Sequence, residues 1–153
     1  MLVAKDDPFA LSTLRLKPSK TASLKAWVRF AGGSKLSAAK LGVGFNSLAF
    51  FCDALPPPVL NISLADWVPT IEYTVHFWQD PFTLDASTTT FSADGVDGVP
   101  EGNPDDNNTW MRGYFRSPTV ANGVLYTDGD LWSADGKHLL AKSRQMARLL
   151  SRR

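Results

Sequence analysis

The amino-acid sequence predicts an α+β domain, in which a curved antiparallel sheet of about five strands wraps round one long buried helix. One observation is the stretch 36–60, which combines a helical repeat of apolar residues with very few charges. Another is the set of short strand patterns around it, one before the helix and four after it. A sheet has to cover one of its faces, and this helix is the only candidate cover.

Length and composition point to one globular domain. The chain has 153 residues, of which 44% are hydrophobic and 20% charged, as in soluble globular proteins. A net charge of +1 gives no general attraction to nucleic acid or anionic membranes. The N-terminus lacks the apolar core of a signal peptide, and the single Cys52 favours a reducing compartment. We therefore expect a cytoplasmic protein with no membrane or nucleic-acid partner.

The first strand pattern begins after a lead-in segment or linker at residues 1–21, so we place the domain at residues 22–153. Apolar residues then alternate with Lys25, Trp27 and Arg29. The inward set is Leu24, Ala26, Val28 and Phe30. Trp27 therefore points outward, and an outward tryptophan is typical of an interface between proteins.

The central helix is predicted from spacing and from its end. Its apolar face is formed by Leu41, Phe45, Leu48, Cys52 and Leu55, which follow each other at steps of four, three, four and three. Prolines at 56–58 stop the helix because proline lacks an N–H and clashes with the preceding turn. Asp53 lies in the last turn, at the negative end of the helix dipole. An acid in so unfavourable a place suggests a functional use.

Four further strands are predicted at residues 70–78, 110–116, 124–132 and 138–150. Ser117-Pro118 closes the second of these, and Asp135-Gly136 is a hairpin turn before the last. A helix over 143–150 remains an alternative. Residues 80–109 hold seven acidic residues and no Lys or Arg, which predicts a mobile acidic insertion.

Four segments, in this order along the chain, carry a family resemblance. They are 27–30 (WVRF), 53–57 (DALPP), 67–70 (WVPT) with 75–77 (VHF), and 129–132 (GDLW) with 143–145 (SRQ). The chain resembles the thioesterase-like hotdog superfamily, in particular the C-terminal half of the double-hotdog acyl-CoA thioesterase II family. The hotdog fold of that superfamily is the arrangement predicted above.

The resemblance implies hydrolysis of an acyl-CoA or carrier-bound acyl thioester by water that is held by three side chains. By motif these catalytic residues are Asp53, Thr70 and Gln145. The carboxylate accepts a proton from water, and the hydroxyl and amide orient it, so no cofactor is needed. Two distant His and one Cys offer no metal-site spacing, so we expect no metal. We expect His76 to pack in its apolar strand and His138 to be exposed.

Several alternatives stay open. Asp53 can be a solvated helix end, Thr70 a strand former and Gln145 a surface residue. A double-hotdog enzyme has two such units, and this chain has room for one. The second unit then comes from another copy in a homodimer, from a separate hotdog chain, or is absent. Other functions are a dehydratase or cyclase in polyketide-like metabolism, or a non-catalytic hotdog subunit.

Overall fold

The computed structural model describes residues 2–3, 20–28, 45–62, 67–80, 111–133 and 136–150. The strands are β1 (Leu2–Val3), β2 (Ser23–Val28), β3 (Thr70–Phe77), β4 (Met111–Ala121), β5 (Val124–Ser133) and β6 (Leu139–Arg148). The helices are α2 (Phe45–Asp53) and a 3₁₀ helix, η1 (Pro58–Asn61). None of the helices in the described part of the chain has the length and hydropathy that a membrane span requires.

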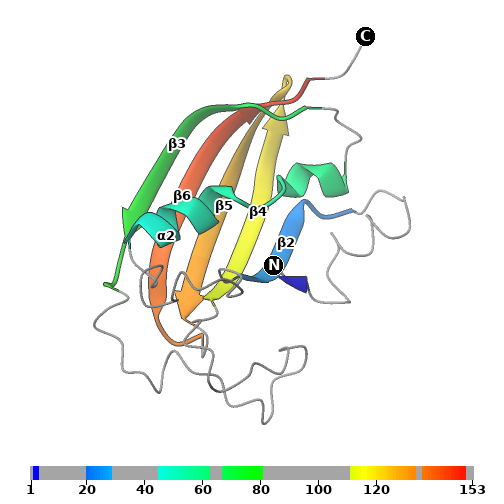
Figure 1. Cartoon of the computed structure of the whole chain (residues 1–153). Coiled ribbons are helices and arrows are strands. Elements are labelled where there is room, and N and C mark those ends of the chain that lie inside the picture. Colours follow the sequence, from blue (N-terminus) through cyan, green and yellow to red (C-terminus); the bar gives the residue numbers. More distant parts are fainter. Residues whose placement is uncertain are drawn as a thin grey trace, which may run out of the picture.

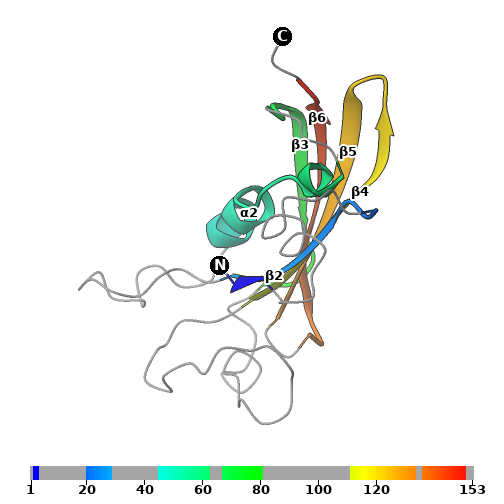
Figure 2. The same ribbon diagram turned by 90° about the vertical axis from the view of Figure 1, so that its right-hand side faces the viewer.

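The sheet has the order β1-β2-β4-β5-β6-β3, and its neighbours are antiparallel. It curves, and α2 lies across one of its faces (Figure 1). Turned by 90°, the sheet is seen nearly edge-on with α2 on one side (Figure 2). The predicted α+β class, with a curved antiparallel sheet on one helix, is confirmed. The sixth strand is β1, two residues from the predicted lead-in that pair with β2.

The core lies between α2 and the sheet. Its main apolar cluster consists of Leu24, Ala26, Val28, Leu48, Phe51, Cys52, Met111, Phe115, Leu131, Leu140 and Ala141. The predicted helix face supplies Leu48 and Cys52 to this cluster, whereas Phe45 is 42% exposed and meets Phe77 edge-on. The last turn of α2 closes when Ala54 N–H donates to Phe50 O at 2.9 Å. Residues 29–44, including predicted Leu41 and Phe30, lie outside the described part.

Strand ends differ from the prediction at one turn. Ser117-Pro118 does not end β4, which runs on to Ala121 with a register shift between Arg116 and Thr119. That irregularity accommodates a proline, which cannot donate to the ladder. The hairpin turn is instead Asn122-Gly123, with φ of 54° and 73°, as a type I′ turn requires. The helix alternative for residues 143–150 is wrong, because β6 continues to Arg148.

One surface prediction loses its support, and another is wrong. Trp27 is on the outward face but is only 9% exposed, because the Arg112 guanidinium lies over its ring at 5.2 Å from the centroid. It therefore gives no support to an interface. His76 is exposed rather than packed, because it lies on the outward face of the edge strand β3. The predicted acidic insertion lies outside the described residues except for Asp80.

Candidate active site

Gln145 connects the other two residues that were expected to form the site, Asp53 and Thr70. Its Nε2 donates to Asp53 Oδ1 at 3.1 Å and to Thr70 Oγ1 at 2.5 Å. A primary amide has two N–H donors, so one group serves both acceptors. Asp53 is 92 and Thr70 is 75 positions from Gln145 in sequence. The fold therefore brings together a helix end and two neighbouring strands.

A β-bulge places Thr70 on the inward face. Tyr73 pairs with Gln145 and Val75 with Ser143, so the odd-numbered residues of β3 face α2. Strict alternation would then turn Ile71 inward and Thr70 outward. The register shifts between Thr70 and Glu72, and Thr70 instead pairs with buried Ala147. The extra residue thus returns the Thr70 side chain to the side of Gln145.

Tyr73 and Cys52 tie the last turn of α2 to the strands that carry the other two residues. The Tyr73 hydroxyl donates to Ala49 O at 3.1 Å, one turn before Asp53. The Cys52 thiol is buried and hydrogen-bonds Ser143 of β6 and Tyr73 of β3. These contacts fix the position of the last turn of α2, and with it Asp53, relative to β3 and β6.

Burial decides the charge state of Cys52 and Tyr73. Desolvation raises the pKa of the Cys52 thiol to about 11, although its hydrogen bonds to Ser143 and Tyr73 act the other way. Desolvation also raises the pKa of Tyr73, and the neighbouring Cys52 and Asp53 add to the rise. Both groups are therefore neutral near pH 7. A thiol needs its thiolate form to act as a nucleophile, so Cys52 is not poised for covalent attack.

Polar residues continue from Gln145 across the inward face. Thr127 of β5 pairs with Gln145, and its hydroxyl shares a buried 2.9 Å hydrogen bond with Ser117 of β4. Beyond this polar band lies a smaller apolar cluster of Val59, Leu125 and Ala147. The side chains of Asp53 and Thr70 are exposed, so water reaches the site. The arrangement offers a carboxylate beside a hydroxyl and an amide at an apolar boundary.

Sequence reasoning did not identify Tyr73, Ser117 or Thr127, because their relation to Gln145 depends on strand register. No three His, Cys, Asp or Glu side chains within the described ranges are grouped closely enough to hold a metal ion.

Comparisons with known proteins agree with the fold. The family model of the acyl-CoA thioesterase C-terminal domain matches residues 4–149. No curated protein matches the chain by sequence. A protein from Thermobifida fusca, proposed to be a thioesterase II, is 26% identical with a TM-score of 0.60. That match covers 94% of this chain and 43% of the other.

Two further solved structures show the fold alone. A hot dog fold protein from Alicyclobacillus acidocaldarius is 23% identical with a TM-score of 0.56, and the match covers 88% of this chain and 41% of that one. A phenylacetic acid degradation-related protein from Ralstonia eutropha JMP134 is 17% identical with a TM-score of 0.54. The latter match covers 85% of this chain and 78% of that one. The chain thus spans less than half the length of the first two structures.

Proposed function

Because the chain belongs to the family of acyl-CoA thioesterase C-terminal domains, we propose that it is a hydrolase that cleaves an acyl-CoA or carrier-bound acyl thioester. The observation that carries this proposal is the pair of hydrogen bonds from Gln145 to Asp53 and Thr70. These residues match the three that the family resemblance assigns to holding water. Asp53 and Thr70 are also open to solvent, as the attack of water requires.

In the proposed reaction Asp53 is the general base. The Gln145 amide engages Oδ1 of Asp53, and the second carboxylate oxygen, Oδ2, takes the proton of the attacking water. The Gln145 amide donates its two N–H groups to Asp53 and Thr70 and so holds both residues in place. The Thr70 hydroxyl orients the water oxygen toward the thioester carbonyl carbon. Addition of hydroxide gives a tetrahedral intermediate. Its collapse breaks the C–S bond, and the proton on Asp53 passes to the leaving thiolate, so the products are a carboxylic acid and a thiol.

We also propose a homodimer, in which a second copy supplies the unit that a double-hotdog enzyme carries in one chain. Among the strands that the structure describes, the edge strand β3 pairs on one side only, with β6. Near it lie large exposed apolar side chains, which are Phe45, Phe50, Trp67, Ile71, Phe77 and Trp78. Unpaired backbone groups beside apolar side chains favour addition of another strand. A separate hotdog chain is the alternative partner.

The proposed reaction is tested with a panel of acyl-CoA thioesters of different chain length, with release of free thiol as the readout. We expect turnover of at least one thioester that depends on enzyme concentration. An enzyme that is folded and dimeric but releases no thiol from any member of the panel would overturn the hydrolase proposal. Release of water or ring closure on an acyl chain without free thiol would favour the dehydratase or cyclase alternative.

A further inference from the structure

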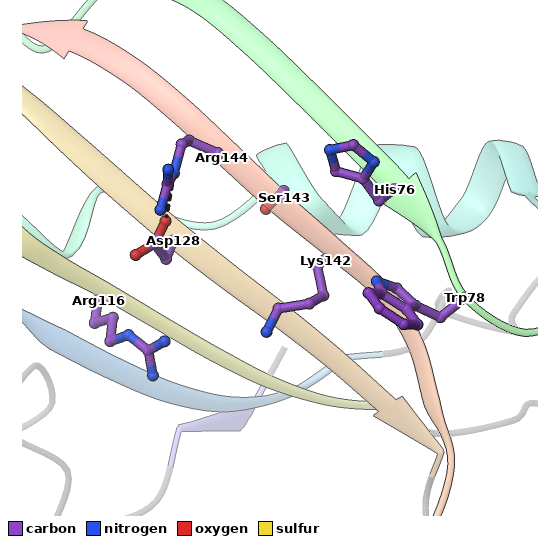
Figure 3. A pocket seen from close by; sticks show the side chains of 7 residues that line it. All are labelled: His76, Trp78, Arg116, Asp128, Lys142, Ser143 and Arg144. Carbon is purple, nitrogen blue, oxygen red and sulfur yellow. Dashed lines mark hydrogen bonds and ion pairs between the residues drawn. The ribbon is translucent and has the colours of Figure 1, made fainter.

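The outward face of the sheet, opposite α2, carries a hollow that is separate from the Asp53 site. Its volume is about 360 Å³, and its lining includes His76, Trp78, Arg116, Asp128, Lys142 and Arg144 (Figure 3). The pairing explains their common face, because His76 pairs with Lys142, and Asp128 with both Arg144 and Arg116. These residues alternate with the inward ones, so four strands contribute side chains to one hollow.

Positive charge dominates this lining. Three cations, Arg116, Lys142 and Arg144, face one lining carboxylate, Asp128. Arg144 Nε donates to Asp128 Oδ1 at 2.9 Å, and this contact raises the pKa of Arg144. Lys142 Nζ lies 3.2 Å from Asp130 Oδ1 just outside the hollow. Each of these contacts uses one donor, whereas a guanidinium has five N–H donors and an ammonium three.

The third cation lies on the other side of the hollow. The Arg116 guanidinium lies over the Tyr114 ring, at 5.5 Å from its centroid. A guanidinium held over a ring in this way carries N–H donors from which an anion can accept hydrogen bonds. Cations thus reach the hollow from β4 and from β6, with Asp128 on β5 between them. An anion that binds here has to bridge both sides to outweigh Asp128 in the lining and Asp130 beside it.

Trp78 adds an aromatic surface at the rim. Its ring is 65% exposed, while its backbone N–H donates to Leu140 O at 2.9 Å. The residue is therefore held at the end of β3 with its indole in solvent beside Lys142 (Figure 3). An indole face stacks with any flat base, which is a common way to hold a nucleotide.

We propose that this hollow is a binding site for a nucleoside phosphate. The base stacks on Trp78, and the phosphate oxygens accept hydrogen bonds from Arg116, Lys142 and Arg144. The volume is at the small end of the range for ligand sites, which suits one nucleotide. An acidic peptide fits less well, because it needs a line of cations rather than one hollow with one ring. The site is on the opposite sheet face, so the proposal does not depend on thioester hydrolysis.

Calorimetric titration of the full chain with ADP, adenosine and pyrophosphate tests the proposal. We expect ADP to bind more tightly than pyrophosphate, and adenosine to bind least. Trp78→Leu should weaken the binding of ADP by at least about fivefold, which is the lower end of what base stacking contributes. The same substitution should leave the binding of pyrophosphate unchanged. Arg116→Gln should weaken the binding of ADP and the binding of pyrophosphate by the same factor. Coenzyme A as a further probe separates a free nucleotide from the nucleotide end of a carrier.

Two variants serve as matched controls. Trp67 is also 65% exposed but lies before the start of β3, at the other end from Trp78, so Trp67→Leu should leave ADP binding unchanged. Lys20 is an exposed cation that does not line the hollow, so Lys20→Gln should have no effect either. Failure to bind ADP at millimolar concentration would overturn the proposal. So would equal affinities for ADP and pyrophosphate that do not respond to Trp78→Leu.

Discussion

The hydroxyl of Tyr73 donates a hydrogen bond to the main-chain oxygen of Ala49, so β3 holds the last turn of α2 in place. Because Tyr73 also pairs with Gln145 in the sheet, one residue connects the helix end of Asp53 with the strand of its donor. Tyr73→Phe keeps the buried ring and removes the hydroxyl. We expect kcat to fall by about tenfold with KM unchanged, and the free energy of unfolding to fall by about 1 kcal/mol.

Steady-state kinetics and urea unfolding measure these effects. Tyr126→Phe is the control, because Tyr126 is 41% exposed and lies on β5 away from the helix. A Tyr73→Phe enzyme with wild-type kcat would show that the hydroxyl does not position Asp53.

Gln145→Glu should nearly abolish turnover. The substitution replaces the two N–H donors of the amide by a carboxylate beside Asp53, where like charges repel. We expect kcat to fall by at least about 100-fold. In Gln145→Ala only the orientation of Asp53 and Thr70 is lost, so kcat should fall less. The rate of thiol release by both variants shows which loses more activity. Circular dichroism gives the concentration of folded protein, so that the rates are compared at equal amounts. Equal activity of the Glu and Ala variants would contradict the role of Gln145 as a donor to Asp53.

The buried thiol gives the protein a stability change at alkaline pH. The pKa of Cys52 is raised from 9.0 to about 11 in the folded state, so the native protein holds this proton more tightly than the unfolded chain. Stability is therefore full below pH 9 and is lost as pH rises through 11. The loss is on the order of 2 kcal/mol. The free energy of unfolding of wild type and of Cys52→Ala, measured between pH 8 and 11, checks this loss. An equal dependence on pH in the two proteins would refute it.

Gly129 is required where the Phe115 ring packs on the sheet. A Cβ on Gly129 would lie 2.5 Å from that ring and also too close to the Ser143 hydroxyl. We expect Gly129→Ala to destabilise the fold by about 1–3 kcal/mol through overpacking of the core. Combining it with Ser143→Ala should recover part of the loss, because one of the two clashes disappears. Thermal unfolding measures both, and a fully stable Gly129→Ala protein would disprove the close packing.

The proposed homodimer depends on the free edge of the sheet. Ile71, which is 56% exposed in the bulge of β3, should lie at the junction of the two copies. We expect Ile71→Lys to convert the dimer to a monomer, because a lysine on an edge strand opposes pairing. Val120→Lys is the control, since Val120 is 40% exposed but lies near the β4–β5 hairpin. Light scattering gives the mass, and an active wild-type monomer would refute the proposal.

The sequence predicted the elements better than their surroundings. The strand pattern at 70–78 agrees with β3 to one residue, because β-branched and aromatic residues lie between clear ends. Ser117-Pro118 predicts an end for β4, but Asn122-Gly123 is the stronger hairpin signal and forms the turn. Alternation gave the face of Trp27 correctly, but it carries no information on what covers that face. Arg112 does so from the neighbouring strand.

The candidate site was accessible from sequence only through motifs. Asp53, Thr70 and Gln145 were named by family resemblance, and each alone has an ordinary structural interpretation. Their meeting depends on the bulge at Ile71 and on the β3–β6 register, which periodicity does not reveal. The outward hollow likewise depends on which residues of β4, β5 and β6 face each other. Local patterns do not contain such long-range pairings.

We propose that Asp53 activates water for thioester hydrolysis, and its substitution tests this role directly. Asp53→Asn keeps the size of the side chain and removes the base, and it is compared with wild type on the best acyl-CoA substrate from the panel. We expect kcat to fall by about 10²–10⁴-fold while KM and the unfolding temperature stay close to wild type. A folded Asp53→Asn enzyme that releases thiol at the wild-type rate would contradict the claim.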